Sequence, residues 1–207
     1  MERIGVLGGT FNPVHNGHIH LARWFIKSLS LDRVLLVPVK SPPHKGDVEL
    51  VSAQQRLEMC RLAVAPELKL DVSDIEITRG GVSYTVDTLK ALSRQYKDTR
   101  LYLLTGADMF LTLEKWHDFS QIPNLAALCA TARHADELDA LCSYAKYLEL
   151  QYGAECHIEN MPVLEVSSTQ IRSLLASGND ASSMLPPKVY EYILANNLYR
   201  TIMTIPF

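Results

Sequence analysis

One glycine-rich stretch near the N-terminus, GGTFNPVHNGH from Gly8 to His18, most constrains how this chain can fold. An apolar run at 3–7 precedes it and predicts a buried strand, whereas residues 19–29 repeat apolar side chains at helical spacing. A strand, a glycine-rich turn and a helix in this order direct backbone N–H groups and a helix N-terminus toward a bound phosphate. The stretch therefore predicts an α/β protein with an anion site at the end of its first strand.

The residue types within this stretch suit a phosphate group. Gly8 and Gly9 let the main chain turn tightly and approach a ligand without an intervening Cβ. His15 and His18 stand three residues apart at the helix entry, where each imidazole can donate hydrogen bonds to phosphate oxygens. Surface residues or a partial metal site are the alternatives for such a pair, but no Cys or acidic ligand stands at the spacing a metal requires. The stretch is neither a Walker A loop nor the GxGxxG dinucleotide fingerprint.

Composition limits the class of protein. The 207 residues, 47% of them hydrophobic, can bury the core of one α/β domain. The net charge of −3 provides no basic field for nucleic acid, and no apolar run reaches transmembrane length. The cysteines at 60, 129, 142 and 156 lack paired spacing, which predicts buried free thiols in a reducing compartment. We therefore expect a soluble cytoplasmic protein without nucleic-acid or membrane partners.

Two loops that follow predicted strands carry further candidate residues. The strand at 34–37 opens into a loop that two tandem prolines stiffen, and this loop presents Lys45 as a phosphate candidate. The strand at 101–105 ends at Gly106 and Asp108. A carboxylate at that position can accept hydrogen bonds from ribose hydroxyls, and the glycine admits a flat ring. Ligands gather at these strand ends in open parallel sheets.

Two helix starts complete the pattern of candidate anion sites. Ser83 or Thr85 is expected to cap a helix that runs to about residue 95. Ser167 and the two hydroxyl residues after it open another helix, with Arg172 about one turn inside. Hydroxyls, free N–H groups and a guanidinium at one helix start suit a second phosphate, although serine-rich caps are also common as purely structural features.

We expect a doubly wound parallel sheet with helices on both faces, in a single domain over 1–207 with a small helical portion at about 167–200. Ser52 and Gln55 form a capping box for a helix to about residue 65. The other expected helices lie at 135–150 and 189–195, and the other expected strands at 68–72, 125–131, 156–159 and 163–164.

Together these motifs resemble the nucleotidyltransferase α/β-phosphodiesterase superfamily. Its HxGH and SSTxIR signatures match His15–His18 and Ser167–Arg172. Within it the chain is similar to the bacterial nicotinate mononucleotide adenylyltransferases, through PPHK at 42–45, SYT at 83–85 and GAD at 106–108, with Trp116 beyond them. The chain departs from these relatives after the fifth strand, where many of them carry Arg-Pro-Gly and it has Arg133-His134-Ala135.

The resemblance implies a Rossmann-like fold and transfer of AMP from ATP to nicotinate mononucleotide. It also implies residue roles. The expected catalytic residues are His15, His18 and Arg172. The expected ATP-binding residues are Gly8, Gly9, Thr10, Phe11, Gly106, Asp108, Ser167, Ser168 and Thr169. The expected acceptor-binding residues are Lys45, Tyr84, Thr85, Trp116 and Arg133.

The same resemblance sets the expected cofactor and partners. Mg²⁺ is expected to be held mainly by the substrate phosphates, without protein ligands, and ATP and nicotinate mononucleotide are the expected small-molecule partners. A homo-oligomer is compatible with this assignment. The alternatives are an adenylyltransferase acting on phosphopantetheine or nicotinamide mononucleotide, a cytidylyltransferase, and a nucleotide-binding module without turnover.

Overall fold

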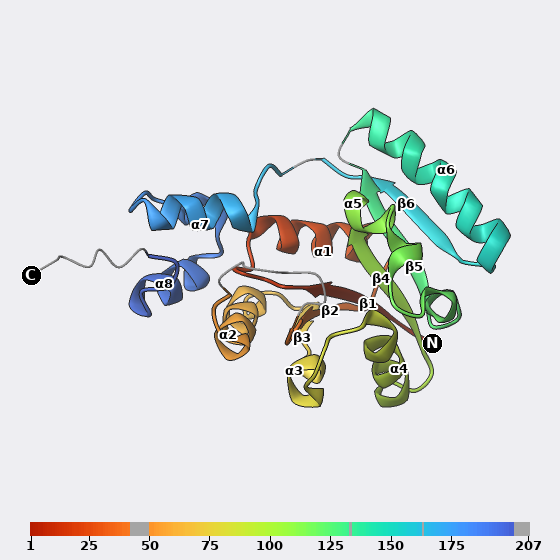
Figure 1. Ribbon diagram of the computed structural model, residues 1–207, viewed down its shortest axis with the longest axis horizontal. Helices are drawn as coiled ribbons and strands as arrows, with labels where there is room; N and C mark the ends of the chain where they lie inside the picture. The colour runs from red at the N-terminus through yellow and green to blue at the C-terminus, as the bar shows by residue number, and fades with distance from the viewer. Residues whose placement is uncertain (42–49, 133, 163, 201–207) are drawn as a thin grey trace, which may run out of the picture.

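A six-stranded, all-parallel sheet forms the centre of the protein (Figure 1). The structure, a computed structural model, describes residues 1–41, 50–132, 134–162 and 164–200. The strand order is β3-β2-β1-β4-β5-β6, so β1 lies between β2 and β4 and the order reverses beside it. Ligands bind at such a reversal in open α/β sheets. The strands are β1 (Glu2–Gly9), β2 (Arg33–Pro38), β3 (Leu70–Val72), β4 (Thr99–Gly106), β5 (Ala126–Ala132) and β6 (Cys156–Asn160).

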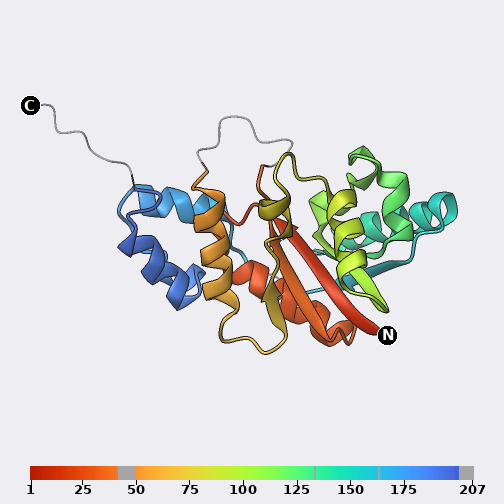
Figure 2. The same cartoon turned by 90° about the horizontal axis from the view of Figure 1, so that it is seen from below.

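Helices cover both faces of the sheet, as the sequence predicts. They are α1 (Asn16–Ser28), α2 (Ala53–Val64), α3 (Ile75–Arg79), α4 (Thr85–Gln95), α5 (Ala107–Phe110), α6 (Ala135–Tyr152), α7 (Ser168–Ala176) and α8 (Pro187–Ala195). Short 3-10 turns lie at Leu113–Lys115, Phe119–Asn124 and Ser182–Met184. Figures 1 and 2 show α7 and α8 beside α2 at one end of the molecule and α6 at the other.

The strands build two separate cores because their side chains alternate between the two faces. In β2, Val34 and Leu36 pack with α1, α2, α7 and α8, whereas Leu35 and Val37 pack with α4 and α6 on the opposite face. Strands buried on both sides read as continuous apolar runs, which is why this one was recognisable in the sequence.

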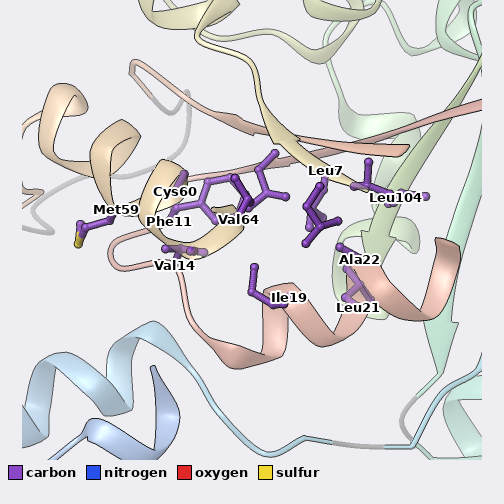
Figure 3. Packing of buried hydrophobic residues seen from close by; sticks show 14 of the residues in the cluster. Leu7, Phe11, Val14, Ile19, Leu21, Ala22, Met59, Cys60, Val64 and Leu104 are labelled. Carbon is purple, nitrogen blue, oxygen red and sulfur yellow. The ribbon is translucent and has the colours of Figure 1, made fainter. Parts of the chain in front are cut away.

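The loop after β1 belongs to the first of these cores. Phe11 is 2% exposed and lies near Cys60 and Val64 of α2 (Figure 3). Val14 of the same loop is also buried. The candidate phosphate loop therefore has an apolar underside anchored between α1 and α2.

Two sequence expectations need correction. Cys60 and Cys129 are buried thiols as predicted, but Cys142 is exposed and Cys156 only partly buried. Cys142 follows Leu141, which lies on the stripe of α6 that faces the sheet, so the cysteine points to solvent. The strand expected at 163–164 is absent at Leu164, while Val163 lies outside the described residues. No helix in the described part of the chain has the length and apolarity needed to cross a membrane.

Candidate active site

The turn from β1 into α1 places the two predicted histidines on one helix start. His15 is the N-cap of α1, and the backbone N–H of His18 donates to the carbonyl oxygen of His15 at 2.9 Å. The backbone N–H of His15 in turn donates to Nδ1 of His18 at 3.2 Å. Because Nδ1 accepts this hydrogen bond, the neutral His18 ring is assigned its hydrogen on Nε2. His18 can therefore donate a hydrogen bond from Nε2.

The two imidazoles lie against each other and are largely removed from water. Their ring centroids are 3.7 Å apart, and the edge of Phe11 contacts His18 at 4.9 Å between centroids. Burial lowers the pKa of His15 to about 4. Burial, together with the neighbouring His15, lowers the pKa of His18 well below its ordinary value. Both rings are thus neutral at pH 7, and each neutral ring can donate one hydrogen bond.

The two adjacent glycines before this turn differ in the space that a side chain would have. A Cβ on Gly9 would lie 2.9 Å from the Phe11 ring, so Gly9 is needed for the ring to fold beneath the strand end. A Cβ on Gly8 would meet nothing within 4 Å, and Gly8 is exposed. Phe11, expected to contact ATP, has its side chain in the core and supports the loop from there. Thr10 is partly buried beside it.

The start of α7 is bonded to the same loop, 155 to 160 residues away in the sequence. Arg172 donates from Nη1 to the carbonyl oxygen of Asn12 at 2.9 Å and from Nη2 to Oγ1 of Thr169 at 3.2 Å. The hydroxyl of Ser168 donates to the carbonyl oxygen of Pro13 at 2.9 Å. The structure therefore brings the two predicted phosphate motifs together.

Other contacts of this C-terminal part were not anticipated from the sequence. The hydroxyl of Tyr199 donates to Oδ1 of Asn12 at 2.9 Å, and Nδ2 of Asn16 donates to the carbonyl oxygen of Ser183 at 3.0 Å. Ser167 caps α7 as predicted, accepting a hydrogen bond from the Gln170 N–H. The residue types of Asn12 and Tyr199 gave no signal of pairing, because the contact joins opposite ends of the chain.

The predicted ribose-binding residues stand at the end of β4, next to β1 in the sheet. Gly106 is the N-cap of α5, and Asp108 lies in its first turn. Both residues are exposed, and a Cβ on Gly106 would meet nothing within 4 Å. Open space therefore lies above this strand end, as it does above Gly8 on the neighbouring strand.

The predicted acceptor residues meet at the start of α4. Tyr84 stacks on His117 with centroids 4.2 Å apart, which brings the segment carrying Trp116 against this helix start. The expected cap is wrong: Tyr84 is the N-cap, and no side chain caps α4. Ser83 instead accepts a hydrogen bond from the Lys40 N–H at 3.1 Å, and Thr85 is the first helical residue. Sequence reasoning did not select His117, although it directly follows Trp116.

Two predicted acceptor residues, Lys45 and Arg133, lie outside the described residues. Within the described residues, no three His, Cys, Asp or Glu side chains gather at metal-binding distance. The donors around His15, His18 and Arg172 are N–H groups and hydroxyls, which complement phosphate oxygens rather than a bare cation.

Known proteins match this arrangement over nearly the whole chain. The family model described as cytidylyltransferase-like matches residues 6–174, a span that includes both phosphate motifs. A protein of Clostridium botulinum named "Probable nicotinate-nucleotide adenylyltransferase" is 36% identical over 94% of this chain and 98% of its own length. A protein of the same name from Carboxydothermus hydrogenoformans is 37% identical over 96% of this chain and 98% of its own length.

The chain belongs to the nicotinate-nucleotide adenylyltransferases of the cytidylyltransferase-like family. Solved structures agree on the fold of this family. The Plasmodium falciparum nicotinic acid mononucleotide adenylyltransferase complexed with NaAD is similar with a TM-score of 0.77, at 19% identity over 96% of this chain and 98% of the other. The same enzyme complexed with APC gives a TM-score of 0.75 at 18% identity, over equal shares of both chains.

Proposed function

We propose that this protein transfers AMP from ATP to nicotinate mononucleotide, producing nicotinate adenine dinucleotide and pyrophosphate. Family membership supports the reaction. The observation that carries the site assignment is the hydrogen bond from Arg172 to the carbonyl of Asn12, because it joins the phosphate motif before α1 to the one at the start of α7. A triphosphate placed there meets donors from both ends of the chain.

In the proposed reaction, a phosphate oxygen of nicotinate mononucleotide attacks the α-phosphorus of ATP. A new P–O bond forms, and the bond from that phosphorus to the β-phosphate bridging oxygen breaks in line with it. The attacking phosphate is already ionised at neutral pH, so no general base is required. The two histidines, neutral before binding, suit this step because each donates a hydrogen bond and neither has to remove a proton.

We assign one role in the proposed reaction to each of three groups of residues. His15 and His18 donate to the α-phosphate and bridging oxygens, where negative charge shifts as pyrophosphate departs. Arg172 and the start of α7 hold the β- and γ-phosphates, and Asp108 accepts hydrogen bonds from the ribose hydroxyls. Mg²⁺ would be held by the phosphates of ATP and would supply charge neutralisation on the leaving group.

The acceptor side leads us to expect that an acid is preferred to an amide. The start of α4 has no side-chain cap, so its N–H groups and dipole favour the ring carboxylate of nicotinate mononucleotide. A hydrogen bond to a charged group contributes about 1.5–3 kcal/mol. We therefore expect kcat/KM for nicotinate mononucleotide to exceed that for nicotinamide mononucleotide by roughly ten- to a hundredfold.

The test is an acceptor-dependent assay of the full chain with ATP and Mg²⁺. Pyrophosphate release and dinucleotide formation are measured with nicotinate mononucleotide, nicotinamide mononucleotide, phosphopantetheine or no acceptor. Release that depends on nicotinate mononucleotide supports the proposal. ATP binding without turnover would instead indicate a binding module, and release with phosphopantetheine alone would indicate a different transferase. The cytoplasmic location expected from the sequence stays a prediction.

A further inference from the structure

Arg56 of α2 is a buried cation that the proposed catalytic roles do not use. It is 1% exposed and is the largest side chain buried to this degree in the described part of the chain. Its Nη1 donates to the carbonyl oxygens of Thr10 and Val39, both at 2.7 Å. Its Nη2 donates to the carbonyl of Lys40 and its Nε to that of Val51, each at 3.2 Å. The guanidinium therefore binds four backbone carbonyls.

Three of these carbonyls belong to the chain segments that leave two adjacent strands, and the fourth, that of Val51, lies just before α2. Thr10 follows β1 in the phosphate loop, whereas Val39 and Lys40 follow β2. The segments are also bonded directly, since the Val39 N–H donates to the carbonyl of Gly9 at 3.0 Å. A guanidinium presents donors in a fixed planar fork, whereas the ammonium of lysine is a single point charge. Arginine is thus suited to hold both segments at a set separation.

The contacts continue from Lys40 toward the acceptor side. The Lys40 N–H donates to Oγ of Ser83 at 3.1 Å, and the Ser83 N–H donates to the carbonyl of Ser41 at 3.2 Å. Ser83 directly precedes Tyr84, the N-cap of α4. A continuous path of hydrogen bonds therefore links Thr10, on the nucleotide side, through Arg56 and Lys40 to the helix start on the acceptor side.

We propose that Arg56 is a positioning residue that fixes the phosphate loop, residues 8–15, relative to residues 39–41 and the start of α4. The inference rests on the proposed function, since direct in-line transfer needs two substrates held at reacting distance. Displacement of such groups by about 1 Å can lower the rate on the order of a hundredfold. The carbonyl partners compensate the desolvation of the buried charge. Arg56 can therefore fix the positions of the two segments without contacting substrate.

The kinetic test compares substitutions at two arginines of α2. Arg56→Lys keeps the charge without the fork, and Arg56→Met removes the charge. Arg61→Lys is the matched control, because Arg61 is half exposed and pairs only at long distance with Glu58 and Asp74 among the described residues. We expect kcat to fall by roughly ten- to a hundredfold in both Arg56 variants, with KM for either substrate changing by less than about threefold. The control should match the unsubstituted protein.

A second readout separates positioning from loss of folding. Hydrogen exchange is measured by peptide for the full-length variants at a temperature where circular dichroism shows each to be folded. Exchange should accelerate in Arg56→Lys at 8–15 and 39–41 and stay unchanged in α6. Such a local increase accompanying the fall in kcat supports the proposal.

Two results would overturn the assignment of Arg56. One is unchanged kcat and loop exchange in Arg56→Lys. The other is faster exchange throughout the chain with a fall in kcat that matches the unfolded fraction, which would make Arg56 a general stability residue. If the unsubstituted protein makes no dinucleotide, the proposed function fails. The exchange experiment then still decides whether Arg56 fixes the two loops.

Discussion

The phosphate side and the acceptor side of the site differ in how firmly their residues are held. On the phosphate side, the tilted rings of His15 and His18 lie 3.7 Å apart between centroids, His15 is buried, and Arg172 is bonded to the loop backbone. On the acceptor side, Tyr84 rests on an exposed His117 at a helix start that no side chain caps. Groups proposed to meet the reacting atoms are thus held by neighbouring rings and backbone and are buried or partly buried, whereas His117 on the acceptor side is exposed. We therefore expect substitutions on the phosphate side to change kcat and the free energy of unfolding, and substitutions on the acceptor side to change mainly KM.

The largest expected effect is on turnover, from His18→Ala. Removing one fixed donor to a developing oxyanion lowers kcat by roughly 10²–10³, or about 3–4 kcal/mol. Thr85→Val, on the acceptor side, should act mainly on KM for nicotinate mononucleotide and lower kcat/KM by less than about tenfold. Steady-state kinetics with both substrates varied measures the contrast. Comparable effects of the two variants on kcat would contradict the division of roles.

The next effect concerns pH and stability. Since the folded pKa of His15 is about 4, below its ordinary 6.5, the unfolded chain binds a proton between these values that the folded chain does not. The contribution of neutral His15 to the free energy of unfolding is therefore fully present above pH 6.5. As pH falls toward 4, this free energy decreases by about 3 kcal/mol. His15→Asn should reduce this loss, and Thr85→Val should retain it. Urea unfolding at pH 7 and pH 4.5 tests the prediction, and parallel pH profiles for the His15 variant and the unsubstituted protein would refute it.

The smallest expected effect separates two adjacent glycines within the phosphate side. Gly9→Ala forces its Cβ against Phe11 and should lower the free energy of unfolding by about 1–3 kcal/mol. Gly8→Ala should change stability by less than about 0.5 kcal/mol. Its Cβ instead projects into open space at the phosphate loop, so KM for ATP should rise roughly tenfold, about 1.4 kcal/mol. Denaturation and ATP titration of both variants measure this. Equal stability losses would show that the space above Gly8 is not open.

Most of the fold was predictable because local patterns determine it. Continuous apolar runs marked the buried strands, and Ser52 with Gln55 forms the predicted capping box at the start of α2. The two phosphate motifs were recognisable because each combines a chain turn with side chains of one chemistry. Their proximity, seen in the bond from Arg172 to Asn12, does not follow from these local patterns, because β4 and β5 separate β6 from β1 and the chain runs back across the molecule before α7 begins (Figure 1).

The contacts that sequence reasoning missed depend on partners distant in the chain. Arg56 stands among apolar positions of α2, and only its four carbonyl partners from three segments explain a buried cation. Ser83 looked like a helix cap, but the Lys40 N–H, on a neighbouring loop, engages its hydroxyl instead. Cys142 was misjudged because thiols favour burial on average, whereas its position on α6 faces solvent.

The bond between Tyr199 and Asn12 has a consequence for synthesis of the protein. A ribosome makes the phosphate loop before any strand other than β1, yet the side chains that hold this loop from α7 onward come after all six strands. A nascent chain can pair β1 with β2 and wind α1 while Asn12 still lacks both Arg172 and Tyr199. The two histidines therefore acquire their final surroundings only near the end of translation, and incomplete chains do not carry a finished nucleotide site.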